Sequence, residues 1–215
     1  MRLPCLALLS ALLVTVALAQ DCPRWDGKGA TSVGRSMRIS GQVGGEDWRI
    51  VNTDRSYNYK LRATWLTPEV ICAAARLAQI SQGLSEDETQ ALVVEAEKVS
   101  DTVILVEIDP REGSGVIPRD WIAQLRPRTQ GPDSTRMVRG VSAPQLRELR
   151  ALAGTERSDY AYDVFWVVFP LHRPDGKPVF ADSDAEAELV VRIYDKVGRV
   201  RWTIPDSIRK KMSSP

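Results

Sequence analysis

The chain contains one histidine, His172, and imidazole is the side chain that most often serves as a general base near neutral pH. A serine nucleophile would depend on this imidazole, but the sequence has no Gly-x-Ser-x-Gly elbow. The four residues after His172, Arg-Pro-Asp-Gly, carry proline at the second position and glycine at the fourth, which predicts a type I turn. We therefore interpret His172 as a structural residue at the start of a turn, and we predict no catalytic residues.

A second candidate is the segment ADSDAEAEL, whose acids occupy alternate positions, so that an extended backbone would project them to one side. These acids are Asp182, Asp184, Glu186 and Glu188. The spacing is similar to the start of a calcium loop, but Ala187 stands where that loop needs glycine and Ile193 where it needs an acid. We predict a solvated acidic strand start and no metal site, since one histidine and two distant cysteines do not supply a zinc ligand set either. A carboxylate pair for glycan hydrolysis stays open, because the distance between two acids depends on the fold.

Six tryptophans raise the alternative of a glycan-binding module, because exposed indoles can stack on sugar rings. They are Trp25, Trp48, Trp65, Trp121, Trp166 and Trp202. The strand patterns below assign Trp48, Trp166 and Trp202 to apolar faces, which favours core packing over sugar binding. The patterns leave open whether Trp25 and Trp121 are exposed.

The N-terminus has the features of an export signal. Arg2 precedes the apolar run Leu6–Ala19, and the small-residue pattern that ends this run predicts cleavage between Ala19 and Gln20. The run is 14 residues long, shorter than the roughly 20 residues that a membrane-spanning helix needs. The small or apolar residues that a lipoprotein signal requires before Cys22 are absent, so we expect a soluble, exported mature chain without a membrane span.

The cysteines also indicate export, because their number and position fit a disulfide formed in an oxidising compartment. Cys5 lies within the predicted signal, which leaves Cys22 and Cys72 as a natural pair in an oxidising environment. A buried free thiol at Cys72 is the alternative, but Cys22 near the mature terminus would then be a reactive thiol. We predict a disulfide between Cys22 and Cys72.

Charge is balanced overall and uneven along the chain. Signal cleavage removes one of 29 basic residues and none of the 28 acids, so the mature net charge is zero. This balance argues against nucleic acid or an anionic membrane as partner of the whole surface. The segment Leu84–Glu112 has nine acids and two bases, whereas Arg126–Arg157 has seven arginines and three acids. These blocks are solvated faces, or surfaces that meet within one molecule or between molecules.

A hairpin is predicted near the N-terminus. The segment MRISGQVGGEDWRIVN alternates apolar and polar residues around Gly44-Gly45. A two-residue turn there would place Gly41 opposite Trp48 and Ile39 opposite Ile50.

A strand and two helices follow. The segment YNYKLRATW predicts the strand, and Thr67 with Pro68 then predicts the start of a helix that ends before Gly83. Ser85 and Glu88 form a capping box at the start of the second helix. We expect the two helices to form a hairpin packed on sheet.

The remaining segments predict mainly strands. TVILVEID and RDWIAQL predict two of them, and YDVFWVVF is apolar at consecutive positions, which is typical of a strand covered on both faces. AELVVRIYDKVGRVRWTIP predicts a hairpin around Asp195–Gly198, with Ile193 opposite Val200. That register also sets Arg192 against Arg201, an unfavourable contact that Glu188 could offset.

We predict an α+β fold dominated by antiparallel sheet, with a sandwich-like C-terminal half and an N-terminal helical hairpin. Residues 1–19 are the signal, and residues 20–215 form one exported domain with a candidate subdomain break near residues 127–135. The leading hypothesis is an exported, non-catalytic protein, periplasmic or secreted, that acts through contacts with a protein partner whose identity is unknown. An exported carboxylate-dependent hydrolase and a glycan-binding module are the alternatives. We expect no cofactor.

Overall fold

The computed structural model describes residues 22–44, 57–98, 101–110, 120–128, 134–143 and 162–213. Its helices are α1 (Gly27–Ser36), α2 (Pro68–Gln82), α3 (Glu86–Lys98), the short 3-10 helix η1 (Ser134–Arg136) and α4 (Asp206–Ser213). Its strands are β1 (Arg38–Gly44), β2 (Tyr57–Leu66), β3 (Thr102–Pro110), β4 (Ile122–Pro127), β5 (Val138–Arg139), β6 (Val141–Ser142), β7 (Asp163–Phe169), β8 (Glu186–Ile193) and β9 (Lys196–Thr203). The predicted signal, its cleavage site and Trp48 lie outside the described residues.

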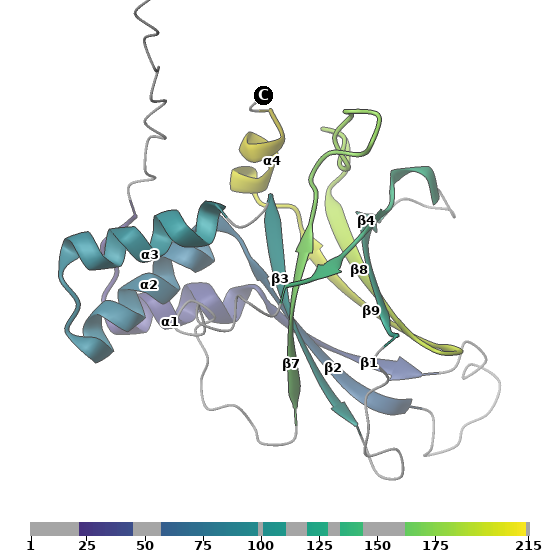
Figure 1. The fold of residues 1–215 in the computed structure, drawn as a ribbon, viewed down its shortest axis with the longest axis horizontal. Coiled ribbons are helices and arrows are strands. Elements are labelled where there is room, and N and C mark those ends of the chain that lie inside the picture. The colour runs from purple at the N-terminus through teal and green to yellow at the C-terminus, as the bar shows by residue number, and fades with distance from the viewer. Residues whose placement is uncertain are drawn as a thin grey trace, which may run out of the picture.

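All the described strands belong to one antiparallel sheet, in the order β5-β4-β8-β9-β1-β2-β3-β7-β6 (Figure 1). The predicted α+β class with a dominant antiparallel sheet is confirmed. The finer expectation of a sandwich-like C-terminal half is not confirmed, because β9 pairs with β1 and β7 pairs with β3 in the same sheet. The candidate break near residues 127–135 stays a prediction.

The sheet curls almost into a barrel because one short segment joins its two ends. Strands β5 and β6 stand at opposite ends of the strand order, and only Gly140 separates them along the chain. The amide of Gly140 donates to the carbonyl of Ala123, and the amide of Ala143 donates to the carbonyl of Trp166. A β-carbon at Gly140 would lie 2.4 Å from Cγ1 of Val167, so this crossing requires glycine.

The inside of the curled sheet is a filled aromatic and aliphatic core. Trp65, Phe169 and Phe180 are fully buried there, and the rings of Trp65 and Trp202 meet edge to face with centroids 5.7 Å apart. Both indoles find a hydrogen-bond acceptor: Nε1 of Trp65 donates to Oγ1 of Thr102 at 2.7 Å, and Nε1 of Trp202 donates to the carbonyl of Met37 at 2.9 Å. The assignment of Trp202 to an apolar face is therefore right.

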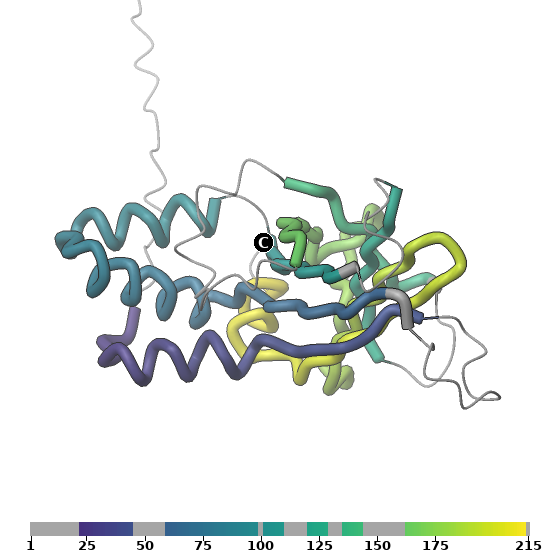
Figure 2. The backbone as a smooth tube through the Cα atoms, turned by 90° about the horizontal axis from the view of Figure 1, so that it is seen from below, coloured from purple at the N-terminus to yellow at the C-terminus, as the bar shows by residue number. Residues whose placement is uncertain are grey.

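A second apolar cluster lies on the outside of β2, β3 and β7, where the helices cover the sheet. Leu105 and Trp166 point outward from β3 and β7 and pack in one cluster with Val70 of α2 and Val93 of α3. Helices α1, α2 and α3 lie side by side next to the sheet (Figure 2). Strand β7 thus has buried side chains on both faces, as its continuous apolar sequence predicts.

Helix α2 begins and ends where the sequence predicts, and α3 begins where the sequence predicts. The hydroxyl of Thr67 accepts from the amide of Val70, and Gly83 ends α2 with a φ of 69°. At the start of α3, the amide of Ser85 donates to Glu88 at 2.8 Å and the amide of Glu88 donates to the hydroxyl of Ser85 at 3.2 Å. The predicted capping box is confirmed.

Two predicted hairpin registers are wrong. Strand β1 pairs with β2 and β9, so Gly41 lies opposite Leu61 and Ile39 opposite Ala63, while the predicted partners, residues 48 and 50, lie outside the described residues. The β8–β9 hairpin turns at Tyr194-Asp195, which places Val200 opposite Leu189 rather than Ile193.

The glycine in the predicted β8–β9 loop has another role. Gly198 lies within β9, facing β1, where a β-carbon would come 2.6 Å from Cγ2 of Val43. The position needs glycine because two strands approach closely there, and not because the chain turns.

Candidate functional site: an arginine face on the outside of the sheet

Strict alternation along β4, β8 and β9 sorts their side chains into two sets. Leu125, Leu189 and Val200 point into the core, so their neighbours along each strand point outward. The outward set is rich in arginine. We call its arginines the arginine face: Arg126, Arg128, Arg139, Arg192, Arg199 and Arg201.

The centre of the arginine face is a row of three charged residues on adjacent strands. Glu188 of β8 lies directly opposite Arg126 of β4 on one side and Arg201 of β9 on the other. Nη2 of Arg126 is 2.6 Å from Oε2 of Glu188, and Nε of Arg201 is 2.9 Å from Oε1. Each carboxylate oxygen therefore accepts from a different guanidinium, and the expected clash of Arg192 with Arg201 does not occur, because Arg192 lies opposite Val197.

The environment of Glu188 keeps it ionised. Only 4% of its side chain is exposed, and this burial alone would raise its pKa. Hydrogen bonds and the positive charges of Arg126 and Arg201 outweigh the burial, so the pKa of Glu188 lies below its ordinary value. The carboxylate is a fixed negative centre that orders the two arginines beside it.

The remaining arginines surround this row. Nη1 of Arg128 lies 2.5 Å from Oε2 of Glu186, whereas Arg139, Arg192 and Arg199 are exposed. Among the described residues, the face thus combines six arginines with two carboxylates, which is a net charge of +4. The chemistry available to it is the binding of carboxylates or other anions by guanidinium groups.

The acidic segment that suggested a calcium loop forms ion pairs. Asp184 is buried, its Oδ2 lies 2.6 Å from Nη1 of Arg136, and it also accepts from the amide of Ala181 at 2.7 Å. Together with the pairs of Glu186 and Glu188, this places three of the four alternating acids against arginines. Asp182, the fourth, is exposed. These ion pairs fix the start of β8, and three of the arginines, Arg126, Arg128 and Arg136, come from the basic segment Arg126–Arg157.

His172 has a structural contact. Its Nε2 lies 3.1 Å from the carbonyl of Met212, to which the Nε2-protonated imidazole donates, and its backbone bridges to Pro178. The amide of Gly176 donates to the carbonyl of Arg173 at 2.9 Å, which closes the predicted turn. The imidazole thus connects this turn to α4.

The two tryptophans that the sequence left unassigned are half-buried. Trp121 packs edge to face on Phe165, with centroids 4.9 Å apart, and Trp25 packs against the apolar cluster beneath the helices. Trp166 is buried under the helices, as its apolar setting predicts.

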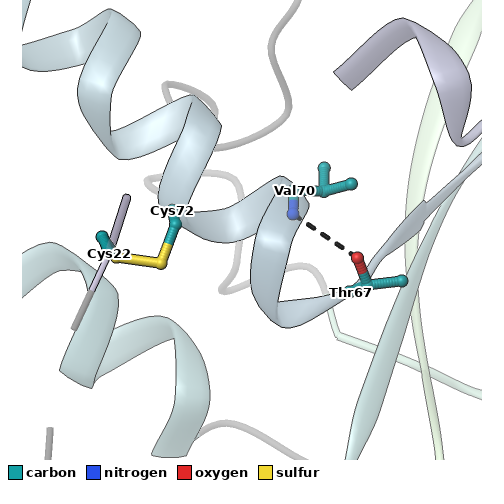
Figure 3. Close-up of a disulfide and its surroundings, with 4 residues drawn as sticks. All are labelled: Cys22, Thr67, Val70 and Cys72. Atoms are coloured by element: carbon teal, nitrogen blue, oxygen red, sulfur yellow. Dashed lines mark hydrogen bonds between the residues drawn. A yellow bond between two sulfur atoms is a disulfide. The ribbon is translucent and has the colours of Figure 1, made fainter. Parts of the chain in front are cut away.

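Cys22 and Cys72 lie at bonding distance on the helical side, with Sγ atoms 1.95 Å apart (Figure 3). Cys72 comes from α2 and Cys22 from the segment before α1. A groove of about 680 Å³ beside them is lined by residues that include Arg24, Arg76, Glu86 and Gln90. Two of its arginines have contacts there, because Arg24 pairs with Glu86 and Nε of Arg76 donates to the carbonyl of Trp25.

The sequence did not identify the arginine face. Arginines at alternate positions in KVGRVRWT were a visible signal, but the wrong hairpin register set Arg201 against Arg192 instead of Glu188. Comparison of the chain with protein-family models, with curated proteins and with solved structures found no match.

Proposed function

We propose that this chain is an exported, non-catalytic protein, periplasmic or secreted, that acts through protein–protein contacts made by the arginine face. The predicted signal and the Cys22–Cys72 pair support export. The observation that carries the binding role is the outward side of β4, β8 and β9, which combines six arginines with two carboxylates and on which Arg139, Arg192 and Arg199 are exposed. Within the ranges that the structure describes, no helix has the length and apolar character to cross a membrane.

The partner that fits this face is a protein surface rich in carboxylates. Arginine forms planar, paired hydrogen bonds with carboxylates and is enriched at protein interfaces. The ordered Arg126–Glu188–Arg201 row presents guanidinium groups at fixed positions, which lowers the entropic cost of binding. The balanced charge of the whole mature chain argues against nucleic acid as the partner.

The hydrolase alternative receives less support from these contacts. A glycoside hydrolase needs one carboxyl group whose pKa is raised, so that it can donate a proton. Glu188 has a lowered pKa, and Asp184 and Glu186 also accept from guanidinium groups. The glycan-binding alternative requires neighbouring exposed indoles, whereas Trp65, Trp166 and Trp202 are buried.

The test is a pulldown from native envelope extract with the mature protein and two charge-reversal variants. Arg192→Glu with Arg199→Glu reverses two exposed residues of the face, and Lys28→Glu with Lys177→Glu makes the same change in charge at exposed positions elsewhere. An acidic protein recovered by the wild type and the lysine variant, but lost with the arginine variant, is the expected result. Equal recovery of every bound protein by both variants would refute the proposed role of the face.

A further inference from the structure

We propose that the occupant of the arginine face is helix α3 of a second copy of this chain, so that copies associate head to tail. This inference rests on the proposed function, because it uses the same face and names the partner. It explains two features together, the positive wall on one part of the molecule and an acidic helix on another.

Helix α3 has the complementary charge. Its 13 residues, EDETQALVVEAEK, contain five acids and one lysine, which is a net charge of −4. Val93 and Ala96 point toward the apolar cluster, so the opposite side of the helix faces solvent. Asp87, Glu88 and Glu95 are exposed.

The two surfaces are also similar in size. A helix of 13 residues is about 20 Å long. The outward residues of β8, from Glu186 to Arg192, span roughly 20 Å along an extended strand, and the arginines on β4, β5 and β9 widen that strip. An acidic helix can therefore contact several arginines of the face at once.

The two surfaces do not meet within one molecule. The apolar cluster under α3 includes residues of β2, β3 and β7, and not of β4, β8 or β9. Both views of the fold place helices α1, α2 and α3 at one end and the β8–β9 hairpin at the other (Figures 1 and 2). A contact between two different surfaces of the same chain is heterologous, so it adds copies in a row unless the rotation closes a ring.

Such an interface depends on salt. Its charges are exposed, and the Debye length falls from about 20 Å at 0.02 M salt to about 4 Å at 0.5 M. We expect sedimentation equilibrium of the oxidised mature protein to show a weight-average mass that rises with protein concentration at low salt. At 0.5 M salt we expect the monomer mass.

Two variants test the two surfaces separately. Arg192→Glu with Arg199→Glu cancels the net charge of the arginine face, and Asp87→Lys with Glu95→Lys cancels the net charge of α3. Each variant alone should remain monomeric at low salt, whereas the control Lys28→Glu with Lys177→Glu should associate like the wild type. Circular dichroism and urea unfolding verify that each variant folds.

Mixing the two variants is the decisive experiment. The arginine-face variant keeps a native α3, and the α3 variant keeps a native arginine face, so the mixture has one functional contact for each pair. We expect a one-to-one complex that stops at two chains, while the wild type grows further. Each double substitution changes the charge of its surface by four, from +4 or −4 to zero, so the two altered surfaces are not complementary and the complex ends at two chains.

A wild type that stays monomeric at every concentration at low salt would overturn the inference, as would variants that associate like the wild type. Neither result decides the proposed function, which the pulldown tests independently. If the wild type is monomeric but the envelope partner is still lost with the arginine variant, the face binds a different acidic protein. If no bound protein depends on the face, the proposed function fails as well.

Discussion

Two walls of the same sheet share one core, but the outer face of one is apolar and covered by helices, whereas the outer face of the other is charged and open to solvent. The covered wall consists of β2, β3 and β7, and the open wall of β4, β8 and β9. On both walls the inward side chains pack in the aromatic and aliphatic core. On the covered wall the outward side chains include Leu105 and Trp166 beneath the helices, whereas on the open wall they include Arg199 and Arg201, which are exposed.

The difference shows how each face obtains its stability. The covered wall buries apolar area on both sides, and this area is the main source of folding free energy. The open wall depends on its inner side and orders its outer side with ion pairs, which contribute less when the partners are exposed. A surface that contributes little to folding remains free to be selected for contacts with other proteins.

The largest expected change in the free energy of unfolding comes from removing one outward side chain from the covered wall, compared with one from the open wall. Trp166→Ala deletes an indole that is 2% exposed and should lower the free energy of unfolding by about 3–5 kcal/mol. Arg199→Ala on the open wall should change it by at most about 0.5 kcal/mol. Urea unfolding of both variants measures the two values, and similar losses would mean that the outer faces do not differ in this way.

The disulfide sharpens the comparison because it lies on the helical side of the molecule. Cys22 and Cys72 are separated by 50 residues. Replacing both by serine should lower the free energy of unfolding by about 2–4 kcal/mol, chiefly because the unfolded chain gains freedom. Intact mass after alkylation checks the pairing: the oxidised mature chain should take up no alkyl group before reduction and two after it. Two groups before reduction would contradict the bond.

Glu188 tests how much the ionic row stabilises the open wall. Glu188→Gln removes the charge between Arg126 and Arg201, and we expect a loss of about 1–2 kcal/mol at neutral pH, reduced by the partial exposure of both arginines. Because the pKa of Glu188 is lowered in the folded protein, its contribution is present above its unfolded pKa and is lost as the pH falls through the folded value.

The pH dependence separates this effect from packing. Urea unfolding of the wild type should weaken below about pH 4.5 more steeply than that of Glu188→Gln, so that the two curves converge in acid. Arg201→Gln, which keeps Glu188, serves as a second variant. A difference between wild type and Glu188→Gln that is constant from neutral to acidic pH would contradict an ionic role.

The sequence predicted the covered wall better than the open one. Thr67 and Gly83 marked both ends of α2, and the capping box marked the start of α3, because each signal is local. The apolar run of β7 indicated burial on both faces by composition alone. Strand pairing is different, since it joins segments far apart in the sequence, and a local pattern does not specify which strand becomes the neighbour.

The sequence did not predict the arginine-rich outer face of the open wall, mainly because the role of one glycine was misinterpreted. Gly198 looked like part of a loop, but it serves the close approach of β9 to Val43 of β1, which only the assembled sheet reveals. The actual turn at Tyr194-Asp195 contains no glycine. The error moved every pair of the hairpin and concealed the contact between Glu188 and Arg201, and with it the arginine face.

This unusual turn gives the smallest expected effect. Tyr194 has a φ of 54°, a left-handed conformation that is uncommon for residues other than glycine and asparagine, and its side chain is 65% exposed. Tyr194→Asn should therefore raise the free energy of unfolding by about 0.5 kcal/mol, whereas Tyr194→Val should lower it, because a β-branched residue fits this conformation poorly. Urea midpoints with an unchanged slope measure both changes. Shifts in the same direction would show that the ring, and not the backbone, sets the stability at this end of the open wall.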